Sequence, residues 1–244
     1  MSKIELITKD ISKIYGTKVI LKKFNFRVGQ GEVVALLGPN GAGKTTAFYA
    51  IVGIIPATSG TISLNGVDIT RYPLYIRSKL GIGYLPQEAS IFRKLSVEDN
   101  LKIALETKYK NDQQKIKHRI NQLLDEFNIG HIRDSIGAVL SGGERRRVEV
   151  ARILAIDPTF LLLDEPFAGV DPVAVNDIKN IILLLKKKNI GVVITDHNVK
   201  ETLDISDKAY VLYNGEVICS GSADEIEKNK MVRQVYLGDN FSAK

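Results

Sequence analysis

The sequence has little of what marks secreted or membrane-spanning proteins. It is 244 residues long and has one cysteine, Cys219, which excludes a disulfide framework within the chain and favours a reducing compartment. Its longest apolar runs, such as Ile181–Leu185, are too short to span a bilayer. Met1–Asp10 lacks a long apolar stretch behind basic residues, so we expect no signal peptide. These absences predict a cytoplasmic protein whose membrane association depends on a partner or a surface patch.

The balance of charge is positive but does not indicate a nucleic-acid partner. The formal net charge is +6, and the Lys and Arg residues are scattered, with modest clusters at Lys108–Arg119 and Lys186–Lys188. No basic motif is interleaved with aromatic residues in the manner of RNA-binding segments. We therefore interpret both clusters as solvated helix faces and expect no nucleic acid to bind. A hydrophobic fraction of 44% and a charged fraction of 25% are those of an ordinary globular domain.

One glycine-rich stretch fits the phosphate-loop pattern G-x-x-x-x-G-K-[ST] without a mismatch. Its residues are Gly38, Pro39, Asn40, Gly41, Ala42, Gly43, Lys44 and Thr45, and Thr46 follows. Glu32–Leu37 before it predicts a buried strand, and Thr45–Val52 predicts a helix. Backbone N–H groups of such a loop face an anion at a positive helix end, Lys44 can reach the β- and γ-phosphates, and the Thr45 hydroxyl can ligate Mg²⁺. A chance glycine turn is the alternative, and the flanking elements favour nucleotide binding.

A second candidate site lies where an apolar run ends in two carboxylates. Thr159–Leu163 predicts a buried strand, and Asp164 and Glu165 follow it directly. Ligands of open α/β folds bind at the carboxyl ends of the strands. We expect Asp164 to hold Mg²⁺, through water, and Glu165 to orient or deprotonate the attacking water. The alternative is a helix-capping Asp-Glu pair before Pro166.

A third candidate is the start of a predicted helix over Arg145–Ala155. Ser141-x-x-Glu144 before it fits a capping box, which is a purely structural role. Two consecutive glycines, Gly142 and Gly143, exceed what a cap requires and would expose backbone N–H groups to a second anion. Two anion sites and a carboxylate pair suggest a nucleotide held between two surfaces. The spacing alone leaves open whether both surfaces belong to one chain.

Along the chain, strand and helix patterns predict an α/β fold with a mostly parallel sheet interrupted by a helical insertion. Ile4–Ile14 and Val19–Val28 have strand patterning, and Asn65-Gly66 predicts a hairpin turn. From about Glu88 to Ala155 the pattern is mostly helical. We divide a single domain, 1–244, into a nucleotide-binding core (1–87 and 156–244) and a helical subdomain (88–155). Tyr15 falls in a predicted loop ahead of the phosphate loop, where stacking on a base and packing in a core are equally favoured.

Taken together, these motifs resemble the ATP-binding cassette (ABC) ATPases over essentially the whole chain. The resemblance rests on the phosphate loop, Gln87 of the glutamine loop, the signature Leu140–Glu144, Asp164-Glu165, Asp171 of the D-loop and His197 of the switch loop. It implies a phosphate-loop core, an antiparallel N-terminal β subdomain and an inserted α-helical subdomain. It also implies ATP and Mg²⁺ as cofactors.

The resemblance also assigns roles that the residues alone do not establish. It makes Tyr15 the adenine-stacking residue, Gln87 a contact of Mg²⁺ and water, and His197 a γ-phosphate contact. Two such cassettes pair head to tail, so each ATP lies between one chain's phosphate loop and the other's Ser141, Gly142, Gly143 and Glu144, with Asp171 nearby. Glu144 stands where the commonest signature has Gln, and as a capping-box partner it should preserve activity.

Several stretches resemble one branch of the family more than others. The segments at 86–95, 141–147, 166–172 and 195–199 are similar to the ATPase subunits of lipopolysaccharide exporters, and those of branched-chain amino acid importers are the alternative. The first resemblance implies a homodimer on the cytoplasmic face of the inner membrane, beneath two membrane-spanning permease subunits. It places a groove for a permease helix near Gln87, Ile91 and Phe92. From the residues alone, Phe92 is as well interpreted as local core.

Overall fold

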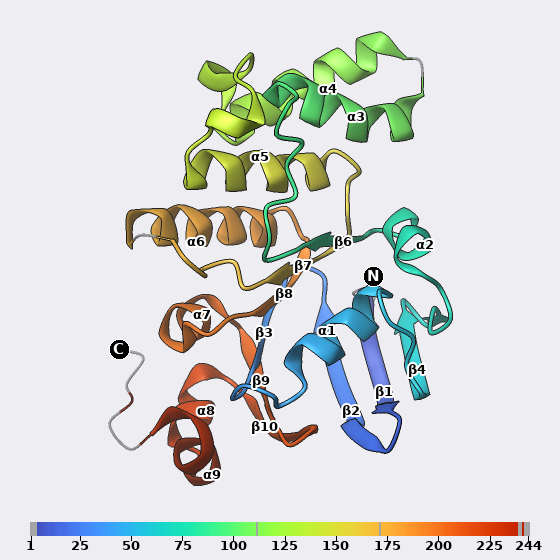
Figure 1. Cartoon of the computed structure of the whole chain (residues 1–244), viewed down its shortest axis with the longest axis vertical. Coiled ribbons are helices and arrows are strands. Elements are labelled where there is room, and N and C mark those ends of the chain that lie inside the picture. The colour runs from blue at the N-terminus through green and yellow to red at the C-terminus, as the bar shows by residue number, and fades with distance from the viewer. Residues whose placement is uncertain (1–3, 111, 171, 239–240, 242–244) are drawn as a thin grey trace.

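The computed structural model describes residues 4–110, 112–170, 172–238 and 241, and within these ranges the strands form two sheets (Figure 1). The smaller sheet is antiparallel, in the order β2-β1-β4-β5. Its strands are β1 (Glu5–Tyr15), β2 (Lys18–Gly29), β4 (Ser59–Leu64) and β5 (Val67–Asp68). Asn65 and Gly66 join β4 to β5 with φ values of 49° and 80°, as the predicted Asn-Gly hairpin turn requires.

The larger sheet has the order β10-β9-β3-β8-β7-β6 and is parallel except where β10 pairs with β9. Its strands are β3 (Val33–Leu37), β6 (Ile82–Leu85), β7 (Phe160–Asp164), β8 (Gly191–Thr195), β9 (Lys208–Tyr213) and β10 (Glu216–Gly221). Every residue of β3, β7 and β8 is buried, because helices or strands cover both faces of the sheet. This burial explains why these strands have unbroken apolar runs rather than an alternating pattern.

One helix lies between the two sheets. It is α1 (Lys44–Val52), and its Phe48 and Ile51 share a hydrophobic cluster with residues of β1, β2, β3 and β7. Its carboxyl end is held by Arg77, a side chain only 1% exposed, which donates to the carbonyls of Ala50 at 2.7 Å and Ile51 at 2.5 Å. A guanidinium at this end satisfies carbonyls that have no partner within the helix. Arg77 belongs to α2 (Leu74–Lys79).

The other helices cover the opposite face of the larger sheet and its far edge. Above the sheet in Figure 1 lie α6, then α5, then α3 and α4, and a single hydrophobic cluster joins them to the sheet. Their bounds are α3 (Val97–Tyr109), α4 (Gln113–Glu126), α5 (Gly142–Leu154) and α6 (Pro172–Lys187). The remaining elements are α7 (Val199–Ile205), α8 (Ala223–Lys228), α9 (Lys230–Val232) and the short turns η1 (Gly130–Ile132), η2 (Gly137–Val139) and η3 (Arg233–Leu237).

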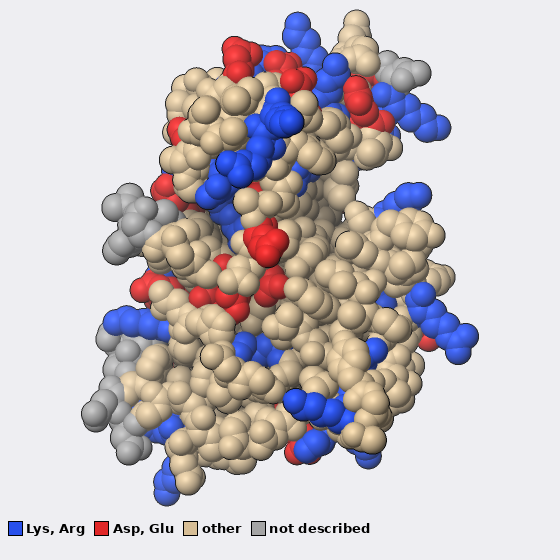
Figure 2. All heavy atoms as spheres, in the orientation of Figure 1, with Lys and Arg blue, Asp and Glu red and all other residues tan. Residues whose placement is uncertain are grey.

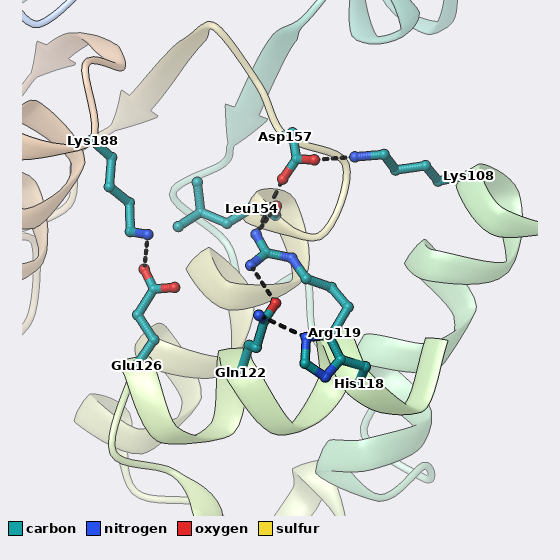
Figure 3. Close-up of polar contacts among 8 residues, drawn as sticks. All are labelled: Lys108, His118, Arg119, Gln122, Glu126, Leu154, Asp157 and Lys188. Atoms are coloured by element: carbon teal, nitrogen blue, oxygen red, sulfur yellow. Dashed lines mark hydrogen bonds and ion pairs between the residues drawn. The ribbon is translucent and has the colours of Figure 1, made fainter. Parts of the chain in front are cut away.

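The two basic clusters of the sequence largely form ion pairs with acidic residues. Arg119 of α4 donates to Asp157 at 3.1 Å and to the Leu154 carbonyl at 3.3 Å, and Lys108 also pairs with Asp157 (Figure 3). Lys188 contacts Glu126 at 2.8 Å. These contacts tie α3 and α4 to the loops that follow α5 and α6. On the face drawn in Figure 2, a stripe of basic side chains crosses the upper, helical part, and acidic side chains gather just below it.

The predicted fold class is confirmed, with local differences. The sequence patterns did not predict α2, β10 or the helices after it, each of which is six residues long or shorter and too short to show a clear period. Tyr15 was expected in a loop, but it is the last residue of β1, where it pairs with Lys18 across the tight turn. The residues around 88–96 and 128–141 are mostly irregular rather than helical. The division into a core and a subdomain at 88 and 155 stays a prediction.

Candidate active site

The glycine-rich loop between β3 and α1 requires its glycines for internal steric reasons. Gly38 has a φ of 144°, and a Cβ there would lie 2.2 Å from the carbonyl oxygen of Leu212. Gly43 has a φ of 105°, and a Cβ there would lie 2.9 Å from the Leu21 side chain. Side chains of L-residues avoid this region of backbone space. The curl of the loop is therefore dictated by the strands that surround it.

The amino end of α1 is open to an anion. Gly43 is its N-cap, and neither a side-chain cap nor an acidic residue satisfies the N–H groups of the first turn. Lys44 is 7% exposed, and its Nζ donates to the carbonyls of Gly38 at 2.6 Å and Pro39 at 3.0 Å. Burial lowers the pKa of Lys44, and the nearby Glu165 carboxylate opposes that shift. The loop thus presents backbone donors and a fixed cation in one place.

A cleft of about 320 Å³ opens onto this loop and brings together residues from distant parts of the sequence. It is lined by Lys18, Ile20, Asn40, Gly41, Gly43, Lys44, Thr45, Thr46, Glu165 and His197. Lys18 and Ile20 were not predicted for this site, because nothing in their sequence pattern distinguishes them from other residues of β2. The cleft combines cationic and backbone donors with one carboxylate, which suits a phosphate ester beside a water molecule.

Glu165 and His197 contact each other at the rim of the sheet. The His197 Nε2 lies 2.7 Å from Oε1 of Glu165. The two residues follow β7 and β8, which are neighbouring parallel strands, so their carboxyl ends meet at the same edge. Glu165 has a φ of 45°, which is uncommon for a residue with a side chain, and its N–H donates to the Thr195 carbonyl at 2.7 Å. The structure thus brings together the two residues predicted as the catalytic pair, and their catalytic role stays a prediction.

Asp164 and Asp196 lie behind that pair and are almost fully buried. Burial raises the pKa of Asp164, and a hydrogen bond from the Tyr84 hydroxyl to its Oδ2, 3.3 Å long, acts in the opposite direction. Asp196 accepts the N–H of Phe167 at 2.7 Å and that of Asn198 at 2.8 Å. Asp196 therefore fixes the segments that carry Glu165 and His197 relative to one another. Neither Tyr84 nor Asp196 was predicted as a site residue from the sequence.

The signature segment lies at the amino end of α5, outside the cleft. Ser141 accepts the N–H of Glu144 at 3.3 Å, and Glu144 accepts the N–H of Ser141 at 2.9 Å, so the predicted capping box is present. Neither Gly142 nor Gly143 has a positive φ, and a Cβ on either would meet nothing closer than 3.8 Å. Within this chain, neither backbone conformation nor crowding requires glycine at these two positions.

Gln87 lines a smaller cavity of about 140 Å³ that Glu165 and Gly142 also line, so it lies between the two candidate sites. The segment after it is held by α5, because Glu149 accepts the N–H groups of Ser90 at 2.6 Å and Ile91 at 3.1 Å. Ile91 is buried in the core, so its side chain does not face a groove as was expected. Phe92 is 47% exposed, which excludes the local-core interpretation.

The predicted adenine-stacking residue is not assembled with the cleft. Tyr15 is 50% exposed and does not line the cleft, and the Lys13 ammonium lies 4.7 Å from its ring centroid. Asp171 lies outside the described residues. A larger open groove of about 830 Å³ runs between β2 and β10, and none of the predicted site residues lines it. Within the described ranges, no helix combines the length and apolarity that crossing a membrane requires.

A glycine loop that ends in an uncapped helix, beside acidic strand ends, defines a nucleotide-binding ATPase of the phosphate-loop class. The chain belongs to the ABC transporter family, which matches residues 21–168. It is an ABC transporter ATPase.

Similar proteins match nearly the full chain. The lipopolysaccharide export system ATP-binding protein LptB of Escherichia coli K12 is 51% identical over 236 residues, which are 97% of this chain and 98% of that protein. An uncharacterized ABC transporter ATP-binding protein of Rhizobium meliloti is 53% identical over 237 residues, 97% of this chain and 87% of its own. The ADP conformation of MJ1267, an ATP-binding cassette of an ABC transporter, superposes with a TM-score of 0.86 at 28% identity and covers 98% of this chain and all of its own.

Proposed function

We propose that two copies of this chain clasp ATP and that its hydrolysis powers lipopolysaccharide export through membrane-spanning permease subunits. The observation that carries the dimer is the pair of glycines in the signature. Gly142 and Gly143 have ordinary φ values and open space around them. A glycine without an internal reason is explained by the close approach of something from outside. The triphosphate held by a second copy is that partner.

Residues at the strand ends and in the first turn of α1 fit the magnesium ion that ATP carries. Thr45, Gln87 and Asp164 offer only hydroxyl, amide and carboxylate oxygens, which are the hard ligands that Mg²⁺ prefers. Phosphate oxygens and water would complete the coordination of the ion. When bound, the ion neutralises charge on the β- and γ-phosphates. Asp164 would hold it through water.

The chain's own groups divide the remaining work. Lys44 and the open N–H groups of α1 bind the phosphates. Glu165 orients or deprotonates the attacking water, and His197, 2.7 Å from it, faces the γ-phosphate. Because both glycine-lined helix ends attract the same negative charge, ATP favours the closed pair, and phosphate release removes that bridge.

The test of the mechanism is Glu165→Gln. It should lower phosphate release by about 10²- to 10⁴-fold while ATP stays bound, because the substitution removes the base and keeps the shape. Sedimentation with ATP and Mg²⁺ should then detect a stable dimer. Lys44→Ala is the control that should stay single for lack of nucleotide. A Glu165→Gln chain that turns over normally, or stays single with ATP bound, would refute the proposal.

The cargo is supported by the identity to LptB, and it has a separate test. The tagged chain should be purified from detergent-solubilised membranes and the co-purifying permeases identified. Two permeases with large periplasmic domains are the expected result. Co-purification of the channel subunits of an amino acid importer would refute the proposed cargo and leave the ATPase mechanism unaffected. Phe92→Ala should reduce this co-purification without unfolding the chain, because an exposed aromatic side chain is a typical anchor of a protein interface.

A further inference from the structure

The hydroxyl of Tyr84 is aimed at the acidic end of β7. It donates to Oδ2 of Asp164 at 3.3 Å. On the parallel strands β6 and β7, the Cα of Tyr84 pairs with that of Leu162. Paired residues share a face of the sheet, and so do residues two apart on one strand. Tyr84 and Asp164 therefore point to the same side because of strand register, not through a flexible loop.

The Tyr84 ring is held in place by the helix that follows the phosphate loop. Its centroid lies 6.2 Å from that of Phe48 in a tilted arrangement and 6.4 Å from that of Tyr49, edge to face. Such aromatic contacts fix the ring beyond what burial alone does. The ring thus lies where α1 meets β6 and β7. The phosphate loop precedes α1, Asp164 ends β7, and Gln87 follows β6.

Core packing does not explain the hydroxyl. A phenylalanine would make the same ring contacts with Phe48 and Tyr49 without desolvating a half-buried hydroxyl. Asp164 is 6% exposed, and a buried carboxylate needs donors. A hydroxyl donor from a rigid strand also restrains rotation of that carboxylate, so the contact affects how Asp164 is oriented.

We propose that Tyr84 is a positioning residue for Asp164, holding its carboxylate in the orientation that receives the magnesium ion of ATP. This inference rests on the proposed function, because it presupposes a magnesium nucleotide at the strand ends. Tyr84 makes no contact with the phosphate loop's glycines or with Lys44 among the described hydrogen bonds. Loss of the Tyr84 hydroxyl should therefore weaken nucleotide binding in the presence of Mg²⁺ and leave binding without Mg²⁺ unchanged.

The test is Tyr84→Phe, which removes the hydroxyl and keeps the ring. A fluorescent ATP analogue is titrated in EDTA and in a series of Mg²⁺ concentrations, and phosphate release is measured over the same series. Binding in EDTA should equal that of the natural chain. The half-saturating Mg²⁺ concentration should rise about three- to tenfold, as expected for a lost hydrogen bond to a charged group. Turnover at saturating Mg²⁺ should fall less than that.

The matched control is Tyr210→Phe, which removes a hydroxyl that accepts from Lys208 at 2.9 Å and lies on β9. It should leave the Mg²⁺ series unchanged, and Asp164→Asn should abolish the response to Mg²⁺. Should Tyr84→Phe not fold, Tyr84→Met offers a side chain without a donor for the same titration.

Three outcomes would overturn the assignment. An unchanged Mg²⁺ half-saturation in the folded variant means that the hydroxyl does not position Asp164. An equal loss of binding in EDTA and in Mg²⁺ means that Tyr84 is only structural. If the natural chain itself neither binds the analogue nor responds to Mg²⁺, the proposed function fails first, and that result is distinct from the other two.

Discussion

Two helices of this chain begin at glycine-rich turns, and their amino ends are built differently. At α1 the turn has no side-chain cap, and its glycines are required by contacts with β2 and β9 of the same chain. At α5, Ser141 and Glu144 form a complete capping box, and the glycines that follow have open space. The first end therefore presents open N–H groups that are shaped within one chain. The second end is already satisfied by its capping box, and only the proposed dimer gives its glycines a role.

The largest effect on stability is expected at the first end. Gly38→Ala should lower the free energy of unfolding by more than about 3 kcal/mol, because a Cβ would meet the Leu212 carbonyl in a strained backbone region. Urea denaturation of the isolated chain measures this, with Gly130→Ala, where the space is open, as the control. A stable Gly38→Ala chain would show that the loop can relax, and that its curl is not imposed by β9.

The second-largest effect on stability is expected at Glu149 of α5, the helix that begins at the signature. Glu149→Gln should cost about 2 to 3 kcal/mol, because it weakens a buried acceptor of the Ser90 and Ile91 N–H groups next to Arg146. Glu106→Gln, at an exposed pair on α3, is the control and should change little. Hydrogen exchange should localise the loosening to residues 88–92. Unchanged exchange there would contradict the role of Glu149 as a clamp.

A smaller effect is expected where α5 meets α6. Arg147→Met removes the ion pair between Arg147 and Asp177, whose side chains are 25% and 36% exposed, respectively. Partly solvated pairs contribute about 0.5 to 1 kcal/mol, and thermal denaturation at low and high salt should show that the loss shrinks with salt. Lys102→Met provides the baseline for a still more exposed pair. A loss well above about 1 kcal/mol would mean that the signature helix depends on this contact for its position.

The smallest change in stability is expected at the signature itself. Gly142→Ala should leave the free energy of unfolding unchanged or raise it by up to about 0.5 kcal/mol, since alanine favours helix and has room. Its ATPase activity should nevertheless fall, because the added methyl group obstructs the partner's triphosphate. Phosphate release and sedimentation with ATP measure both effects. Full activity in this variant would remove the support for a second surface at Gly142.

Much of the fold could be predicted because the decisive signals are local. Short stretches of sequence predict their own conformation in several places. These are the apolar runs of β3, β7 and β8, the loop from Gly38 to Thr45 and the hairpin at Asn65-Gly66. Elements at the carboxyl end of the chain were missed, because α8 and β10 are short and have weak apolar patterns that only packing on β9 stabilises. Tyr15 was misplaced for a related reason, since pairing with Lys18 extends β1 beyond its apolar pattern.

The candidate site likewise has a part that the sequence predicts and a part that depends on the tertiary structure. The chemistry of motifs such as Gly43-Lys44-Thr45 and Asp164-Glu165 could be predicted, because the residues that carry it are neighbours in the sequence. Contacts such as Tyr84 with Asp164 and Asp196 with Phe167 join residues far apart in the chain, and they depend on which strands are neighbours. The burial of Ile91 and the exposure of Phe92 were likewise undetermined, because adjacent apolar residues of an irregular segment have no periodicity that separates inside from outside.

From its amino-acid order alone, this chain is recognisable as a phosphate-binding ATPase, since glycine placement and strand-end carboxylates are short-range features that adjacent residues encode directly. Strand order decided the rest: it brought Glu165 beside His197 and Tyr84 beside Asp164, and it set the Leu212 carbonyl against Gly38. Hydrogen bonds and steric contacts act over a few ångströms, so which residues they join is settled only when the sheet has formed.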